Sequence, residues 1–274
     1  MTRTTRITAL DLDTARLARD LACAERFGYN DSYSEFICGS WRSCMLWNRS
    51  GDVDDCFLED YPGAARSTEY GDALPYLREL VGRHFRVEQL KFARLARLTP
   101  GSVLVPHRDY LELESDLTRI HLPLQTDADC FSAEEETIYQ MKLGEVWFLD
   151  ATRIHSAACR SDRDRVHLIL DFSTSGPADA LRPDSTVGSG IPEDSVVPRR
   201  ALAPGEKKSF ESLADVIDPA NYQDMLAIVI KRYFDADLKA ADVFSWLGDI
   251  AEASGRPELV AKAARHEEHC LVSR

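Results

Sequence analysis

A histidine and an aspartate stand two positions apart directly after the apolar run at residues 103–106. His107 and Asp109 flank Arg108, and side chains at i and i+2 of an extended chain point to the same side. An imidazole and a carboxylate aimed at one point are ligand types for a metal ion. An ordinary polar strand end has the same pattern, so the metal interpretation requires a third ligand elsewhere.

His155 is the histidine best placed to supply that ligand, because it follows a strand-like run at 145–150. Two histidines and one carboxylate with open coordination positions form the facial triad of non-haem Fe(II) oxygenases. Zinc would accept the same ligands. The pattern therefore predicts a metal centre at His107, Asp109 and His155.

In two further strand-like runs, a pair of polar residues again stands two positions apart, so that both side chains point to the same face. Arg119 and His121 alternate with apolar residues in the run 118–125, and Arg165 and His167 do so in the run 165–172. Directing cations into a barrel interior costs several kcal/mol unless a partner is supplied. Two inward arginines favour a dicarboxylate ligand, because the guanidinium fork matches a carboxylate.

The pattern of apolar residues divides the chain into regions. Helical spacing over 11–27 and 72–85 is followed by short β-branched or aromatic runs between 90 and 172, typical of a sandwich or barrel. A stretch rich in Pro, Gly and Ser then leads to helical spacing up to residue 270. The predicted fold is α+β, divided into an N-terminal helical or mixed region packed on the core (1–90), a β core (91–172), a linker (173–208) and a C-terminal helical region (209–274).

The composition excludes several classes of partner. The 274 residues carry 46 acidic side chains against 33 Lys and Arg, a net charge of −13. Such a surface repels phosphate backbones and anionic lipid, so neither nucleic acid nor a membrane is expected as a partner. No signal peptide and no apolar run long enough for a membrane span is recognised. Seven scattered cysteines indicate reduced thiols, and we expect a cytoplasmic protein.

The motifs together resemble a known family. The matching segments are HRD (107–109), RIHLPLQT (119–126), MKLGEVWFLDA (141–151), HSA (155–157) and RVHLILDF (165–172), with a weaker likeness over GSWRSCMLWNRSGD (39–52). They are similar to the aspartyl/asparaginyl β-hydroxylase family of Fe(II)- and 2-oxoglutarate-dependent dioxygenases, and within it to the bacterial proline cis-3-hydroxylases. The resemblance implies a double-stranded β-helix core, that is, a cupin-like jelly roll, with Fe(II) as cofactor and 2-oxoglutarate and O2 as co-substrates.

The resemblance also assigns roles by position. His107, Asp109 and His155 would hold Fe(II) and form the catalytic centre, and Arg165 would pair with the distal carboxylate of 2-oxoglutarate. Arg119 would lie near the 1-carboxylate or the substrate. The other two residues on these inward faces, His121 and His167, are expected to contact the co-substrate.

The substrate contacts are predicted from fewer signals. Arg94 and Arg97 could be ordinary strand charges, but the resemblance favours a pocket-facing Arg97 that binds substrate together with Arg119. Trp41 could pack in the core or form a pocket wall, and we include it among the substrate-binding residues. The side chains expected to serve no site are Trp147, in the core, and His84, His266 and His269, on solvated helix faces.

The predicted function is hydroxylation of a free L-amino acid, at C3 of a cyclic imino acid such as L-proline or L-pipecolic acid. His121 departs from the proline enzymes, so an acyclic amino acid (lysine, citrulline or asparagine) is an alternative. A cupin-like metal isomerase or hydrolase that does not use 2-oxoglutarate is another. The C-terminal helices could close the pocket or form a homodimer.

Overall fold

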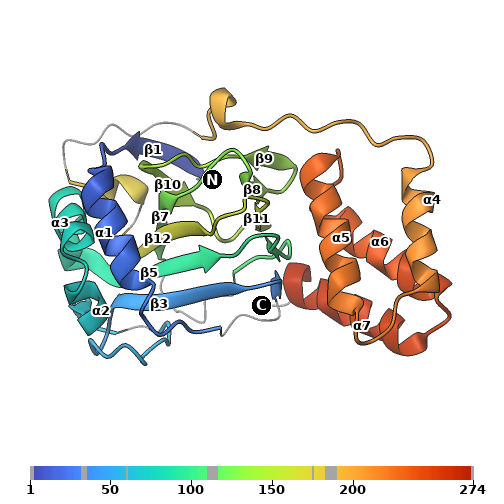
Figure 1. Ribbon diagram of the computed structural model, residues 1–274, viewed down its shortest axis with the longest axis horizontal. Coiled ribbons are helices and arrows are strands. Elements are labelled where there is room, and N and C mark those ends of the chain that lie inside the picture. Colours follow the sequence, from blue (N-terminus) through green and yellow to red (C-terminus); the bar gives the residue numbers. More distant parts are fainter. Residues whose placement is uncertain are drawn as a thin grey trace.

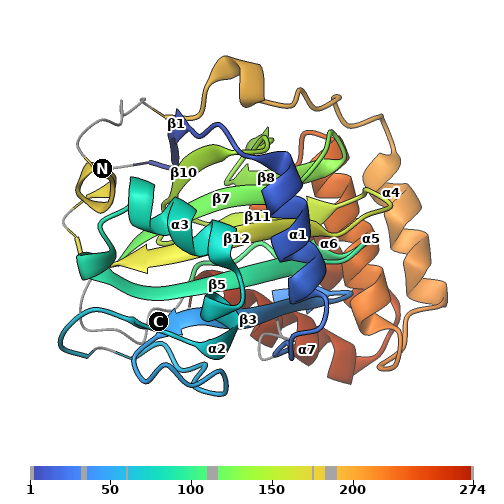
Figure 2. The ribbon, with the colours of Figure 1, turned by 60° about the vertical axis from the view of Figure 1, so that its left-hand side comes forward.

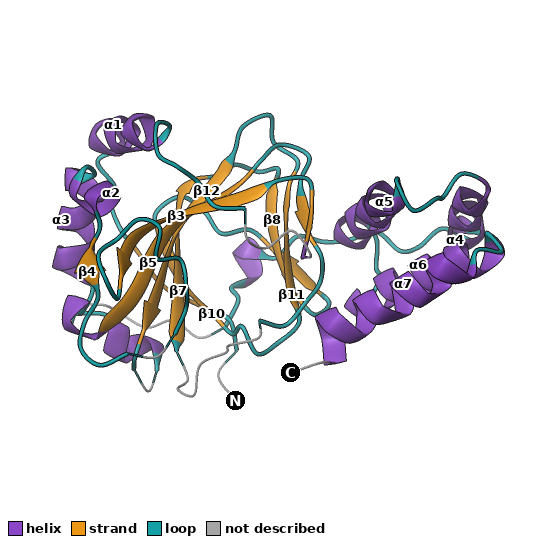
Figure 3. Cartoon of the chain, turned by 90° about the horizontal axis from the view of Figure 1, so that it is seen from below, coloured by secondary structure: helices purple, strands orange, loops and turns teal. Residues whose placement is uncertain are grey.

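Two antiparallel sheets face each other across the interior, with helices on their outer sides (Figure 3). The computed structural model describes residues 3–31, 36–59, 61–109, 117–174, 176–182 and 190–272. The order of strands in the larger sheet is β1 (Thr5–Ala9), β10 (Glu145–Leu149), β7 (Thr118–Gln125), β12 (Arg165–Phe172), β5 (Leu90–Leu98), β3 (Trp41–Asn48) and β4 (Arg66–Ser67). The smaller sheet consists of β2 (Ile37–Cys38), β6 (Val103–Leu104), β11 (His155–Cys159), β8 (Cys130–Glu134) and β9 (Thr137–Tyr139). The fold is the predicted α+β jelly roll.

Side chains of β12 alternate between the two faces of the larger sheet. Val166, Leu168 and Leu170 point outward into a buried apolar cluster. Arg165 and His167 point inward and line a cavity between the sheets. This two-residue period confirms the faces predicted for the run 165–172, because neighbouring side chains of a strand lie on opposite faces.

Helices from the N-terminal part cover the outer face of the larger sheet (Figure 2). They are α1 (Thr14–Ala24), α2 (Glu69–Asp72) and α3 (Pro75–His84). The Asp13 carboxylate caps α1 by accepting from the Arg16 backbone N–H at 2.9 Å. The helix predicted over 72–85 is confirmed as α3, but its start was placed too early: α2 ends at Asp72, and α3 begins at Pro75, where the missing N–H of proline costs no hydrogen bond.

The C-terminal helices pack beyond the smaller sheet (Figure 1). They are α4 (Glu206–Glu211), α5 (Tyr222–Asp235), α6 (Ala240–Ala253), α7 (Pro257–Glu267) and the π-helical turn η6 (Glu268–Val272). Short 3-10 helices are η2 (Val87–Gln89), η3 (Pro177–Ala180), η4 (Glu193–Ser195) and η5 (Ser212–Asp215). Val103 and Ala158 of the sheet share one buried cluster with Val229 and Tyr233 of α5. Among the helices of the described residues, none is long and apolar enough to cross a membrane.

Helices therefore take the apolar outer faces of both sheets, which leaves the inner faces free to carry polar side chains. In an ordinary two-sheet sandwich the inner faces form the apolar core. Here the main apolar clusters lie between sheet and helix. This arrangement makes room for a polar site between the sheets.

Candidate metal centre and active-site cavity

A cavity of about 600 Å³ lies between the two sheets, a size suited to small-molecule ligands. Both sheets contribute polar side chains to its lining. Those from the larger sheet are Arg94, Arg119, His121, Arg165 and His167. Those from the smaller sheet and the segment after β6 are His107, Asp109, Ser132, His155 and Ser156.

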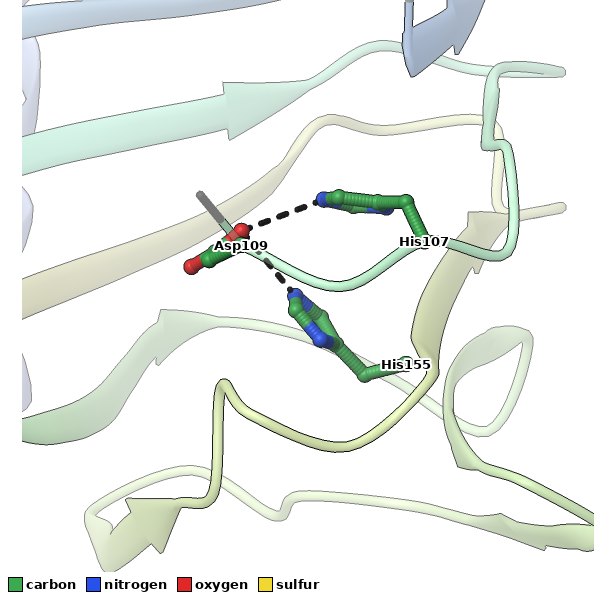
Figure 4. Close-up of side chains that lie close together, drawn as sticks. All are labelled: His107, Asp109 and His155. Atoms are coloured by element: carbon green, nitrogen blue, oxygen red, sulfur yellow. Dashed lines mark ion pairs between the residues drawn. The ribbon is translucent and has the colours of Figure 1, made fainter. Parts of the chain in front are cut away.

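His107, Asp109 and His155 converge at one point of this cavity (Figure 4). Two backbone hydrogen bonds join the histidines: His107 N–H donates to the His155 carbonyl at 3.0 Å, and His155 N–H to the His107 carbonyl at 2.8 Å. The Nε2 atoms of His107 and His155 lie 3.2 and 3.5 Å from Asp109 Oδ1. All three ligand atoms lie within 4.8 Å of one another.

The backbone fixes which nitrogen of each ring faces this point. His107 Nδ1 lies 2.7 Å from the Val105 carbonyl, and His155 Nδ1 lies 3.0 Å from the Arg153 carbonyl. A carbonyl only accepts, so each Nδ1 carries a proton and each ring directs its Nε2 at Asp109. Two imidazole nitrogens and a carboxylate that converge on one point can share a cation, which is either a proton or a metal ion. The donor set therefore fits Fe(II), and backbone carbonyls behind the ligating histidines are typical of metal sites.

Burial and neighbouring charges set the protonation of the three residues in the cluster. Burial alone would raise the pKa of Asp109, but the Arg119 guanidinium holds it well below its usual value. Burial lowers the pKa of His107. For His155 the effect of burial is outweighed by the Asp109 carboxylate, which raises the pKa. A cation bound at Nε2 would take the place of the proton that Asp109 favours on His155.

Arg165 also lines the cavity, and the described residues provide no acidic partner for it. Its guanidinium donates to Ser132 Oγ at 3.0 Å, and among the described residues no carboxylate lies within ion-pair distance of it. The residue is 8% exposed, and burial lowers its pKa. An anion supplied from outside would compensate this buried charge.

His121 and His167 meet beside Arg165 with their Nδ1 atoms 3.3 Å apart. Burial, reinforced by the positive charge of Arg165, holds the pKa of both rings well below the usual value. Both Nε2 atoms are buried without a hydrogen-bond partner in the described part of the chain. In this contact one ring donates its Nδ1 proton to the Nδ1 of the other ring. Because both rings are neutral, the donating ring has a lone pair on Nε2 and the accepting ring has an N–H there.

Two arginines of β5 are placed differently from the prediction. Arg94 lines the cavity, whereas Arg97 points to the outer face, where it contacts Glu25 at 2.6 Å, Tyr29 Oη at 2.8 Å and Asp164 at 3.2 Å. The prediction that Arg97 faces the pocket is therefore wrong. The two-residue period of a strand indicates the correct face: Ala93 and Leu95 lie on the helix-covered face, and Arg97 lies on the same face.

The remaining predicted residues are partly confirmed in position. Trp41 lines the cavity, and Trp147 is fully buried in the core. His269 was expected on a solvated helix face, and this is wrong: from η6 it lines the cavity and stacks on Phe36 with ring centroids 5.0 Å apart. Phe36 in turn lies 4.7 Å from the His107 ring. No local pattern could reveal this contact, because the C-terminal segment reaches the site through tertiary packing alone.

The fold and this site define a 2-oxoglutarate-dependent non-haem iron dioxygenase, and comparisons with known families agree. A family model described as aspartyl/asparaginyl beta-hydroxylase matches residues 10–175. A second, described as L-proline 3-hydroxylase, C-terminal, matches residues 177–274. The chain belongs to the aspartyl/asparaginyl β-hydroxylase family.

Relatives of known activity match over nearly the whole chain. An L-proline cis-4-hydroxylase of Rhizobium meliloti (strain 1021) is 37% identical over 263 residues, which is 96% of this chain and 93% of that protein. Two L-proline cis-3-hydroxylases of a Streptomyces species are 32% and 30% identical over 272 residues, 97% of this chain and 93% of each relative.

Proposed function

We propose that the protein hydroxylates a free cyclic amino acid, L-proline first and its six-membered homologue L-pipecolic acid second, with consumption of 2-oxoglutarate and O2. The observation that carries the proposal is that the His107, Asp109 and His155 cluster and the unpaired Arg165 face one cavity of about 600 Å³. The relatives named L-proline hydroxylases supply the substrate class. The reacting carbon is C3, as the sequence resemblance predicts, or C4, the position named in the Rhizobium relative.

In this proposal the His107 and His155 Nε2 atoms and the Asp109 carboxylate hold Fe(II). When bound, Fe(II) with 2-oxoglutarate and O2 would supply the oxidation: 2-oxoglutarate loses CO2 and gains one oxygen atom to give succinate, and the other oxygen atom enters a C–H bond of the substrate. The protein contributes position and electrostatics. The carbonyls of Val105 and Arg153 hold the two rings in the orientation that this requires.

Arg165 binds the distal carboxylate of 2-oxoglutarate. Its planar fork offers two parallel hydrogen bonds to a carboxylate, and its charge is otherwise uncompensated. His121 and His167 stay neutral beside it, so their free Nε2 atoms orient the co-substrate without adding charge. Trp41 is proposed as an apolar wall of the cavity.

The test is an aerobic incubation with Fe(II), 2-oxoglutarate and a panel of free amino acids, read by mass spectrometry for the gain of one oxygen atom. L-Proline and L-pipecolic acid should both react, because one methylene changes binding by only about 1–3 kcal/mol. NMR of the product distinguishes C3 from C4. Oxygen gain by lysine, citrulline or asparagine, with neither ring compound modified, would contradict the proposed substrate class.

A further inference from the structure

Arg94 is a cavity-lining cation for which the fold provides only a distant counter-charge. It lies on β5 at the position paired with Ile169 of β12, and both side chains line the cavity. The residue is 5% exposed. Its Nε has no hydrogen-bond partner in the described part of the chain, and its Nη2 lies 4.0 Å from Asp171 Oδ2.

Asp171 cannot neutralise Arg94 by itself, because it is already engaged. Arg119 Nε donates to Asp171 Oδ1 at 2.7 Å, and Arg119 Nη1 donates to Asp109. Asp109, Arg119, Asp171 and Arg94 thus form a row of alternating charges that ends on a cation at the cavity wall. A buried cation with an incomplete partner favours an anion from outside.

The position of Arg94 separates it from Arg165. Arg165 is paired with Leu98 and Ile169 with Arg94, so the two arginines stand four residues apart along the ladder. At about 3.3 Å per residue their backbones are roughly 13 Å apart. The two arginines therefore enter the cavity at different levels of the same strand pair, an arrangement that suits two separate anions.

The segment after β3 lies beside the Arg94 end of β5. Tyr61 donates through its hydroxyl to the Lys91 carbonyl, and Lys91 Nζ donates back to the Tyr61 carbonyl at 2.7 Å. The same segment places Leu58 and Asp54 in the cavity lining. An apolar side chain and a carboxylate in the lining of the same cavity suit the ring and the ammonium of a zwitterionic amino acid.

We propose that Arg94 binds the α-carboxylate of the amino-acid substrate, as a specificity-determining residue distinct from the Arg165 site for 2-oxoglutarate. This inference rests on the proposed function. A carboxylate held there would complete the row of alternating charges, and its loss would leave Arg94 with Asp171 at 4.0 Å as its counter-charge.

The test compares L-proline with L-prolinamide, which lacks the carboxylate charge, in wild type and Arg94→Met. Hydrogen bonds to charged groups are worth about 1.5–3 kcal/mol, so Arg94→Met should lower kcat/KM for L-proline by about 10- to 100-fold. The variant should leave the weaker reaction with L-prolinamide almost unchanged. The KM for 2-oxoglutarate should stay within about twofold, and calorimetry on the Ni(II)-loaded protein with 2-oxoglutarate should give a Kd for L-proline raised by the same factor.

Arg97→Met is the matched control, since it removes a buried arginine of the same strand from the opposite face; it should leave the proline-to-prolinamide ratio unchanged. Arg94→Lys keeps the charge and should recover part of the loss.

A raised KM for 2-oxoglutarate with an unchanged proline-to-prolinamide ratio would overturn the inference and assign Arg94 to the co-substrate. If the wild type hydroxylates a different amino acid, the proposed substrate is wrong, and the role of Arg94 is then tested with that amino acid and its amide. The two proposals can therefore be contradicted independently. If the wild type hydroxylates no free amino acid, both fail.

Discussion

Arg119 donates a hydrogen bond from Nη1 to the carboxylate of Asp109, the acidic member of the metal cluster. Arg119 is itself 6% exposed and is held from behind by Asp171 at 2.7 Å. Arg119 therefore keeps the Asp109 carboxyl group deprotonated and fixes its orientation in the metal-free protein.

Replacing Arg119 should weaken metal binding although the residue is not a ligand. Loss of such an outer-shell partner typically costs 10- to 100-fold in metal affinity, so we expect a loss of about that size for Arg119→Gln, measured by calorimetry with Ni(II). Arg119→Lys should lie between this variant and wild type, because it keeps the charge without the fork. Arg97→Gln, a buried arginine outside the cavity, serves as the control. Wild-type affinity in Arg119→Gln would contradict the orienting role.

Removing a ligand itself should have a larger effect. His107→Ala and His155→Ala each delete one of the two Nε2 donors. We expect Fe(II) binding, measured by equilibrium dialysis without oxygen, to fall by more than the roughly 100-fold upper range of outer-shell losses, and turnover to fall with it. His84→Ala, on α3, should bind Fe(II) as the wild type does. Near-normal turnover in either ligand variant would show that the metal assignment is wrong.

Arg165→Lys should raise the KM for 2-oxoglutarate while the protein stays folded. The ammonium keeps the charge but loses the two-pronged geometry that matches a carboxylate. Steady-state kinetics with varied 2-oxoglutarate measure the change. Ser132→Ala, which removes the hydroxyl that accepts from Arg165 at 3.0 Å, should have a smaller effect in the same direction. An unchanged KM in Arg165→Lys would move the carboxylate site to Arg119.

Buried neutral histidines should make the metal-free protein sensitive to acid. Burial, with Arg165 nearby, holds the pKa of His167 well below its usual value, near 6.5 in the unfolded chain. The unfolded state therefore takes up this proton first, so stability is complete above about pH 6.5 and falls as the pH drops below it.

The variant His167→Gln removes one such group. Between about pH 7.5 and pH 5.5 it should lose about 1.4 kcal/mol less free energy of unfolding than the wild type. Urea denaturation of both proteins at the two pH values, with chelator present, measures the difference. Equal losses would mean that His167 is not held neutral in the folded state.

Much of the fold followed from the sequence, because the strand and helix periods are local properties. The run 165–172 alternates polar and apolar residues, and the structure confirms both faces. The helix boundary at Pro75 was missed, although proline at the first helical position is a local signal too. The proposed division at residues 90, 172 and 208 stays a prediction, and β3 and β1 of the first region pair within the larger sheet. The homodimer through the C-terminal helices also stays a prediction.

The site was predicted where a motif defines it and missed where tertiary packing does. The two-residue spacing of His107 and Asp109, together with the family resemblance that adds His155, predicts the three residues that converge in the cavity. The two-residue period of β5 places Arg94 on the cavity face and Arg97 on the opposite face, whereas the family resemblance favours Arg97. His269 reaches the cavity only because η6 docks on the site, where the Arg108 N–H donates to the Cys270 carbonyl at 3.1 Å.

The most direct test of the central claim is to run the reaction with L-proline under ¹⁸O₂ and to measure hydroxylated product and succinate together. If the cavity couples decarboxylation of 2-oxoglutarate to C–H hydroxylation, the two products form in equal amounts and the new hydroxyl carries the label. The same mixture with His155→Ala should yield neither. Formation of hydroxylated product without succinate, or of succinate with L-proline left unmodified, would contradict the account.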